Sequence, residues 1–188
     1  MLNNVNLTII KIVNGILFEK INNLASVYKI LDWIGIFFAD YLLYIVIAVI
    51  LIILFLKRSR LVAISIVISL FISRIVMTEP LKMIFHRARP YVVLENVRKL
   101  IAENNDYGSL PSGHAAIFFA IAAAVFYFNR KLGIFAFVIA ALVGISRIYV
   151  GVHWPIDIVV GAILGIVSGI ITYKFIIIPL IRNLSGRV

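Results

Sequence analysis

Five long apolar runs constrain this chain more than any other feature of its sequence. They cover approximately residues 41–56, 61–78, 112–128, 132–146 and 155–178. A helix needs about 20 apolar residues to cross a bilayer, within a range of roughly 17–25. The first run reaches that length by extending over 36–40, with Asp40 at the membrane interface, and the fourth by extending through Tyr149. We therefore expect an all-α, polytopic membrane helix bundle with five spanning helices.

The composition excludes a water-soluble domain. Hydrophobic residues make up 63% of the 188 residues, whereas soluble globular domains contain about 45–50%. The chain has no cysteine, so disulfides and thiolate chemistry are excluded and the redox compartment stays open. No Gly/Ser-rich linker or low-complexity tract divides the sequence, and we expect one membrane domain.

Residues 1–40 are apolar but carry charges that interrupt any adequate span. Apolar residues recur at helical spacing from Leu24 to Phe38, which favours an amphipathic helix lying in the membrane interface. A sixth, imperfect crossing is the alternative. The start lacks a basic region and a small-residue cleavage site, so a cleaved signal peptide is not expected. We predict that 1–40 is an interfacial helical region joined to a membrane domain of residues 41–188.

Short basic connections predict the orientation of the bundle. Residues 57–60, 129–131 and 174–188 carry eight Lys/Arg and no acid, and alternation through five spans puts all three on one side. Basic loops face the cytoplasm. The loop 79–111, with five basic and four acidic residues, and the turn 147–154 then lie on the extracytoplasmic side. Topology and an anion site explain the net charge of +10, so nucleic-acid binding is not expected.

Three short stretches concentrate the polar chemistry of the chain. They read Lys82-x6-Arg89-Pro90, Pro111-Ser112-Gly113-His114, and Ser146-Arg147-x5-His153-x3-Asp157. Polar groups are expensive in a membrane protein, so a cluster of them indicates a functional site. The three stretches together supply three Lys/Arg, two histidines and a carboxylate. These are the groups needed to bind a phosphate and break its bond.

The first stretch presents two cations. Lys82 and Arg89 are two helical turns apart and would project from one face if the helix after the second span continues. Pro90 restricts Arg89 to extended backbone and ends the helix. A basic cluster against lipid headgroups, which would include His86 and Arg87, is the alternative interpretation.

The second stretch opens an apolar helix directly after Pro111. The unpaired N–H groups and positive dipole at a helix start make an anion site. Ser112 suits the N-cap, and Gly113 lets a ligand approach the backbone. Beside such a site His114 is interpreted as a proton donor; a capped helix with an interfacial histidine is the alternative.

The third stretch joins the fourth span to the fifth. Pro155 suits the first turn of a helix, which places Asp157 in that turn and lets its carboxylate reach His153. A carboxylate on one imidazole nitrogen fixes the tautomer and leaves the other nitrogen free to attack. Compensation of the helix dipole, worth about 0.3–1 kcal/mol, is the alternative for Asp157. Trp154 and Tyr149 are interpreted as interfacial aromatics.

In order and spacing, the three stretches resemble the signature of the type 2 phosphatidic acid phosphatase superfamily, which includes membrane lipid phosphatases and soluble vanadium haloperoxidases. The likeness covers about residues 61–175 and holds at every signature position. It implies a metal-independent phosphatase in which His153 attacks phosphorus, Asp157 orients His153 and His114 protonates the leaving group. It also implies that the phosphate oxygens are held by Lys82, Arg89, Ser112, Gly113 and Arg147.

Among members, the chain is similar to bacterial undecaprenyl diphosphate phosphatases, which recycle the cell-wall lipid carrier. That likeness implies a multi-pass protein of the bacterial plasma membrane with no cofactor, acting on a lipid phosphate or diphosphate. Phosphatases of phosphatidylglycerophosphate, phosphatidic acid and lipid A carry the same signature and are alternatives. An anion transporter is the alternative from another class, although transporter sites lie near the midplane. The sequence leaves the lipid tail and the oligomeric state open.

Overall fold

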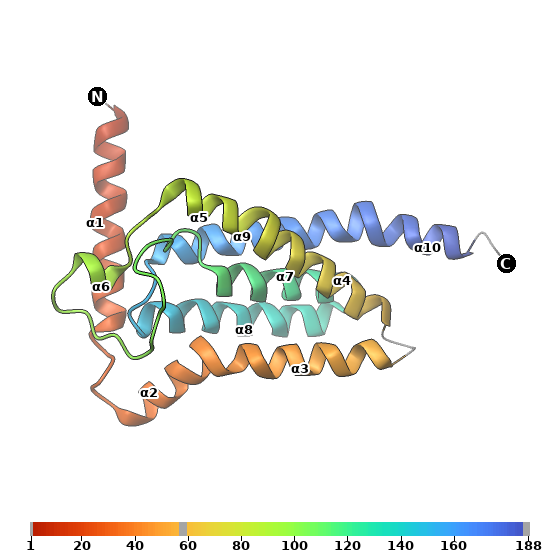
Figure 1. Ribbon diagram of the computed structural model, residues 1–188, viewed down its shortest axis with the longest axis horizontal. Helices are drawn as coiled ribbons and strands as arrows, with labels where there is room; N and C mark the ends of the chain where they lie inside the picture. The colour runs from red at the N-terminus through yellow and green to blue at the C-terminus, as the bar shows by residue number, and fades with distance from the viewer. Residues whose placement is uncertain (1, 57–59, 186–188) are drawn as a thin grey trace.

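The computed structural model describes residues 2–56 and 60–185, and this part of the chain contains helices and no strands. In chain order the helices are α1 (Leu2–Asn22), α2 (Lys29–Ile36), η1 (Phe37–Tyr41), α3 (Leu42–Phe55), α4 (Arg60–Phe71), η3 (Ile72–Thr78), α5 (Glu79–Phe85), α6 (Pro90–Val93), α7 (Gly113–Phe128), α8 (Arg130–Tyr149), α9 (Pro155–Thr172), η4 (Tyr173–Ile177) and α10 (Ile178–Ser185). The three η elements are π-helical turns inside longer helices. Figure 1 shows the long helices side by side as a bundle.

The expected all-helical membrane bundle is confirmed. Within the described residues, four helices are long and apolar enough to cross a membrane: Lys29–Phe55, Arg60–Val93, Arg130–Tyr149 and Pro155–Asn183. The remaining predicted span, 112–128, is α7, an apolar helix of 16 residues, or about 24 Å at 1.5 Å per residue. It packs against α4, α8 and α9 in the bundle, so neighbouring protein rather than lipid covers much of its surface.

Small residues bring α7 and α9 into close contact. A Cβ atom added at Gly165 would lie 2.5 Å from the Ala116 carbonyl oxygen, and one added at Gly161 would lie 2.5 Å from that of Ser112. A Cβ atom added at Gly169, one turn further along α9, would lie 2.5 Å from the Cβ of Ala123. Glycines four residues apart thus let the two backbones approach, as in other membrane helix pairs.

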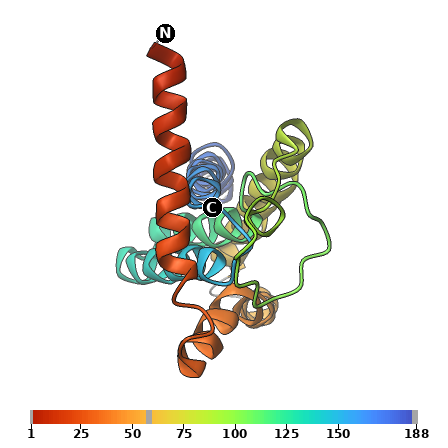
Figure 2. The same ribbon diagram turned by 90° about the vertical axis from the view of Figure 1, so that its left-hand side faces the viewer.

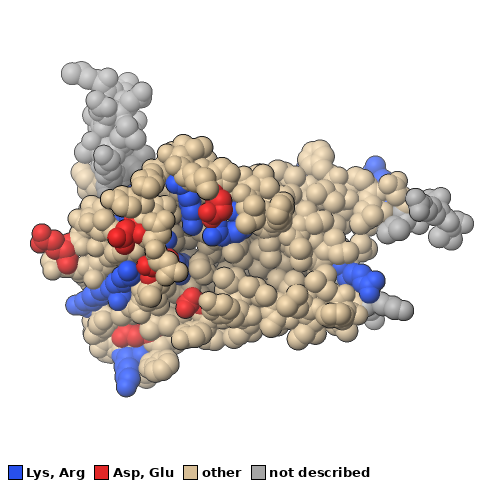
Figure 3. Space-filling model, viewed as in Figure 1, with Lys and Arg blue, Asp and Glu red and all other residues tan. Residues whose placement is uncertain are grey.

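The two ends of the bundle carry different residues. Figure 1 shows the end of α3 and the start of α4 at one end, and the starts of α7 and α9 at the other. Arg60, Arg130 and Lys131 belong to the first of these ends, opposite the signature stretches, as predicted. The predicted basic residues of 57–59 lie outside the described part of the chain. In Figure 3 a wide band without charged residues separates the two charged ends on the visible face.

Helix α1 crosses the signature end instead of joining the bundle. In Figures 1 and 2 it runs across the ends of α7 and α8 and not alongside them. The amide nitrogen of Asn22 donates to the carbonyl oxygens of Tyr149 at 2.8 Å and Arg98 at 2.9 Å, and Asn14 accepts from the Ile156 N–H at 3.0 Å. Helix α1 thus lies across the end of the bundle, and its position in the membrane interface stays a prediction.

The prediction of one amphipathic helix over 24–38 is wrong. The chain turns between α1 and α2, where Ser26 has a φ of 58°, and the helix that begins at Lys29 runs into α3. Asp32 was expected to interrupt a span, but its Oδ1 accepts hydrogen bonds from the Ser26 N–H at 2.9 Å and the Tyr149 hydroxyl at 2.7 Å. Because the protein satisfies this carboxylate, the first spanning helix can include it.

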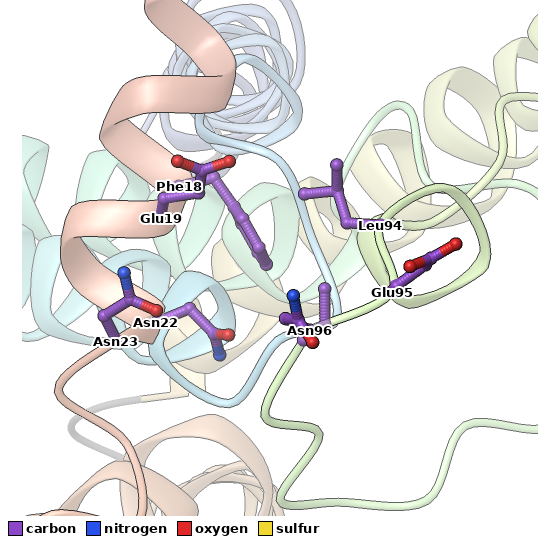
Figure 4. A pocket seen from close by; sticks show the side chains of 8 residues that line it. Phe18, Glu19, Asn22, Asn23, Leu94, Glu95 and Asn96 are labelled. Atoms are coloured by element: carbon purple, nitrogen blue, oxygen red, sulfur yellow. The ribbon is translucent and has the colours of Figure 1, made fainter.

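The interpretation of Trp154 and Tyr149 as interfacial aromatics is also wrong. Each is only 8% exposed. Trp154 packs on Phe18 of α1, with ring centroids 5.2 Å apart, and its Nε1 donates to the Ala88 carbonyl at 3.0 Å. Figure 4 shows the neighbouring pocket of about 360 Å³ between α1 and the loop after α6, where Phe18 and Leu94 point toward each other. Helix α1 thus covers Trp154, whereas Tyr149 packs against Gly35 of α2.

Candidate active site

A cavity of about 180 Å³ lies at the signature end of the bundle. The predicted site residues among those that line it are Lys82, Arg89, Gly113, His114, Arg147 and His153. The other two predicted residues, Ser112 and Asp157, are buried beside them: the Ser112 N–H donates to the Asp157 carbonyl at 3.0 Å. The fold therefore brings together three stretches that the sequence separates.

Lys82 and Arg89 reach the cavity from the two sides of a turn, so the expectation of one continuous helical face is wrong. Helix α5 ends at Phe85, and His86 adopts the left-handed conformation with a φ of 38°. Arg89 then has extended backbone (φ −74°, ψ 159°) before Pro90, as the proline predicts. The cations meet through this turn and not through helical periodicity.

Arg89 is held rigidly against the imidazole of His153. Its Nε donates to the Asn105 carbonyl at 2.7 Å and its Nη1 to the Val152 carbonyl at 2.9 Å. The same Nη1 lies 3.4 Å from His153 Nε2. Two backbone anchors thus fix the guanidinium on the side of the imidazole that faces the cavity.

Arg147 and Glu103 complete the wall around this guanidinium. Arg147 is buried in the last turn of α8, and its Nη1 donates to the Ala39 carbonyl of η1 at 3.1 Å. Glu103 forms an ion pair with Arg147 and a second one with Arg89, 3.2 Å from its Nη2. One carboxylate therefore bridges the two arginines to which the sequence assigns a phosphate.

Asp157 lies on the Nδ1 side of the His153 ring, away from the cavity. Its Oδ2 is 3.5 Å from His153 Nδ1 and accepts from the Trp154 N–H at 2.9 Å. The Ser109 hydroxyl also donates to Oδ2, and Arg87 forms an ion pair with Oδ1 at 2.7 Å. This carboxylate is held on several sides and lies next to Nδ1, which leaves His153 Nε2 facing the cavity.

Burial and nearby charges determine the protonation states of His153 and Glu103, which lie in loops and line the cavity wall. The pKa of His153 is lowered to about 4, chiefly by burial; the Arg147 charge contributes to this lowering, and the Asp157 carboxylate opposes it. Burial alone would raise the pKa of Glu103, but Arg147 and Arg89 outweigh it and the pKa is lowered. At pH 7 the imidazole is thus neutral and can act as a nucleophile, while Glu103 is ionised.

The start of α7 offers hydrogen-bond donors to the cavity. Ser112 is the N-cap, as predicted, and its hydroxyl accepts from the Ala115 N–H at 3.5 Å. Gly113 and His114 line the cavity directly. His114 Nε2 is buried without a hydrogen-bond partner among the described residues. A helix start and an unpaired imidazole nitrogen are suited to an anion with a proton-accepting oxygen.

A comparison with protein families decides the classification. The PAP2 superfamily matches residues 61–177, which is more than half of the chain and contains all three signature stretches. The chain belongs to the PAP2 superfamily. The predicted resemblance to the type 2 phosphatidic acid phosphatases is confirmed.

Relatives of this PAP2 protein match along most of their length. It is 36% identical over 159 residues to bacitracin transport permease protein BcrC of Bacillus licheniformis, covering 83% of this chain and 77% of that one. It is 30% identical over 162 residues to undecaprenyl-diphosphatase BcrC of Bacillus subtilis, covering 85% and 82%. The crystal structure of Aquifex aeolicus LpxE superposes with a TM-score of 0.76 at 31% identity, covering 87% of this chain and 96% of that one.

Four polar residues of the PAP2 site were not predicted from the sequence. Arg74 and Glu103 line the cavity, and Arg87 and Ser109 hold Asp157. Arg74 left a signal, because an ionisable residue inside a predicted span marks a functional site by default. Arg87 was considered only as part of a lipid-facing cluster, yet it pairs with a buried carboxylate. Glu103 and Ser109 left no signal in a loop of nearly balanced charge.

Proposed function

We propose that this PAP2 protein is an integral membrane lipid phosphatase that removes the terminal phosphate of a polyprenyl diphosphate, converting undecaprenyl diphosphate to undecaprenyl phosphate. One observation carries the proposal. A neutral imidazole, backed by a buried carboxylate, points its free nitrogen into a cavity walled by Lys82, Arg89 and Arg147. Those groups match the needs of a nucleophilic attack on a phosphate.

The reaction proceeds in two steps. His153 Nε2 attacks phosphorus, a P–N bond forms, and the bond from phosphorus to the bridging oxygen breaks as His114 gives that oxygen a proton. Nδ1–H stays directed at Asp157, which stabilises the cationic ring. A water molecule then attacks the phosphohistidine, His114 takes up the water's proton, and inorganic phosphate leaves. Both histidines return to their starting states.

The cationic wall supplies the electrostatic part of catalysis. Charge spreads over the equatorial oxygens in the transition state, where Lys82, Arg89 and Arg147 can stabilise it together with the start of α7. Removal of one such donor typically costs about 10²–10³ in kcat. Proton transfer from His114 is expected to increase the rate by a factor of about 10²–10⁴.

The architecture supports a substrate with a long lipid tail and a site on the outer side of the membrane. The cavity lies at one end of apolar helices, so a long prenyl tail can stay in the bilayer while the headgroup enters. The basic connections lie at the opposite end, and the positive-inside rule makes that end cytoplasmic. The cavity then faces the extracytoplasmic side of a bacterial plasma membrane, where the lipid carrier is recycled. A relative named as an undecaprenyl-diphosphatase supports this substrate.

Two other candidates have weaker support. Phosphatidylglycerophosphate or phosphatidic acid fits the same reaction, but the phosphate that either one loses is a monoester, so the leaving group is an alcohol and not a second phosphate. The name of the Bacillus licheniformis relative describes a transport permease, which would fit an anion transporter. Transporter sites lie near the bilayer midplane, whereas this cavity lies at one end of the bundle.

A panel of lipid substrates tests the proposal. Purified protein should release phosphate in the presence of EDTA, because Lys and Arg side chains rather than a metal ion neutralise the phosphate. It should release phosphate faster from undecaprenyl diphosphate than from phosphatidic acid or phosphatidylglycerophosphate. Vanadate should inhibit, since it resembles the five-coordinate transition state. A strict requirement for added Mg²⁺, or a preference for glycerophospholipids, would contradict the assignment.

A further inference from the structure

Arg74 is a cation of the cavity that belongs to none of the signature stretches. It lies in the π-helical turn η3, inside the second spanning helix, and lines the cavity with Lys82 and His114. Its side chain is 35% exposed. A π turn inserts an extra residue into a helix and is frequent at functional sites. An arginine in a membrane helix that opens into a polar cavity needs a functional explanation.

The guanidinium of Arg74 lies against the start of α7. A Cβ atom added at Gly113 would be 3.2 Å from Arg74 Nε and 3.4 Å from Cζ. Glycine at 113 therefore leaves the space that Arg74 occupies. The next residue is His114, the proposed acid, whereas Arg89 stands 3.4 Å from the attacking nitrogen of His153. Arg74 is thus placed on the leaving-group side of the cavity.

Arg74 shares its counter-charge with a second cation. Glu79 forms an ion pair with Arg74, and the same carboxylate oxygen lies 3.9 Å from Lys82 Nζ. One carboxylate serves two cations here, as Glu103 does for Arg89 and Arg147 on the other side. On the leaving-group side, Arg74 and Lys82 together carry one more positive charge than Glu79 neutralises, and this charge can bind a second anionic group.

We propose that Arg74 binds the phosphate of the leaving group and determines the preference for diphosphates over phosphate monoesters. This inference rests on the proposed function. When the bond from phosphorus to the bridging oxygen breaks, that oxygen leaves as part of a polyprenyl phosphate and takes its proton from His114. Arg74 holds the anionic oxygens of that departing phosphate. A monoester releases an alcohol, which presents no anion for Arg74 to bind.

Two substrates compared in one preparation test the role. Arg74→Ala should lower kcat/KM for undecaprenyl diphosphate about 10²-fold and change kcat/KM for para-nitrophenyl phosphate less than about threefold. The ratio of the two values cancels any loss of folded enzyme. Arg74→Lys should restore part of the ratio because the charge remains. Arg130→Ala, a matched change at an exposed site on the opposite end, should leave the ratio unchanged.

Product inhibition gives a second readout. Undecaprenyl phosphate should inhibit Arg74→Ala more weakly than the wild-type enzyme, by about tenfold or more, while inhibition by inorganic phosphate stays the same. Equal losses on both substrates, or unchanged inhibition by undecaprenyl phosphate, would overturn the role of Arg74 alone. A wild-type enzyme that cleaves monoesters but no diphosphate would overturn the proposed function as well.

Discussion

His153 and His114 face one cavity with different surroundings, and this difference separates their chemical roles. His153 has Asp157 behind one ring nitrogen and Arg89 beside the other. His114 stands at the start of α7 with Nε2 unpaired among the described residues. An imidazole with a carboxylate beside one ring nitrogen is suited to act as a nucleophile, whereas an imidazole with an unpaired nitrogen is suited to donate a proton to the substrate.

Replacing the two histidines should therefore cause different failures. His153→Ala should abolish turnover of both a prenyl diphosphate and para-nitrophenyl phosphate, because no group replaces the nucleophile. His114→Ala should retain part of the rate on para-nitrophenyl phosphate, whose leaving oxygen needs little protonation. Asp157→Asn should be intermediate, since it misorients the ring without removing it. The measurement is kcat/KM for each variant on both substrates; near-normal lipid turnover by the His153 variant would exclude a phosphohistidine.

Glu103 is expected to compete with phosphate for two arginines. Its carboxylate bridges Arg89 and Arg147. Glu103→Gln removes the negative charge while keeping the shape, so vanadate should bind more tightly by roughly tenfold, or about 1.4 kcal/mol. The inhibition constant for vanadate measures this, with Glu95→Gln on the exposed loop as the control. Equal or weaker inhibition of the Glu103 variant would show that the carboxylate does not occupy the phosphate position.

At the scale of single residues, the sequence was enough to predict the catalytic and phosphate-binding candidates. It was not enough to predict the residues that form ion pairs with them. Histidines and cations in a fixed order are visible in a linear sequence. Arg87 acts through a pair with Asp157, 70 residues away, and Glu103 through a pair with Arg147, 44 residues away. Such partners depend on how the loop folds over the bundle, and no local pattern encodes that.

At the scale of helices, hydropathy predicted which segments form the bundle but not where they begin and end. The first spanning helix starts before Asp32 because Ser26 and Tyr149 satisfy that carboxylate. Helix α5 ends at the left-handed His86, a conformation that is uncommon for any residue other than glycine. Tertiary contacts decide both boundaries, whereas Pro155 was sufficient to predict the start of α9, and Pro90 the extended backbone of Arg89.

The glycines of α9 are expected to determine how closely it packs on α7. In Gly165→Ala the new methyl group would meet the Ala116 carbonyl at 2.5 Å and the Ala120 backbone nitrogen at 2.8 Å. Overpacking of this kind costs about 1–3 kcal/mol, so the Tm in detergent should fall. Gly15→Ala in α1, where no atom lies within 4 Å of the new methyl group, should keep or raise the Tm, since alanine favours a helix by roughly 0.5–1 kcal/mol. Equal Tm values for the two variants would contradict the close packing.

At the scale of the whole molecule, α1 and the bundle act together at the catalytic end. Asn22 and Asn14 tie α1 to the backbone at Tyr149 and Ile156, on either side of His153. We propose that residues 1–40 and 41–188 form a single membrane domain for this reason. Hydropathy alone could not reveal this arrangement, because the contacts are a few side chains reaching across the bundle's end.

The proposed role in recycling a lipid carrier requires that the cavity faces the extracytoplasmic side. The chain has no cysteine, so single cysteines can report on each end without a background. Asn104 is exposed in the loop beside the cavity, and Asn129 is exposed between α7 and α8 at the opposite end. In intact cells an impermeant thiol reagent should label Asn104→Cys and not Asn129→Cys, whereas both should react after the membrane is permeabilised. Labelling of Asn129→Cys alone in intact cells would reverse the orientation, because the basic connections would then lie outside, and the cavity could not act on a lipid diphosphate at the outer surface.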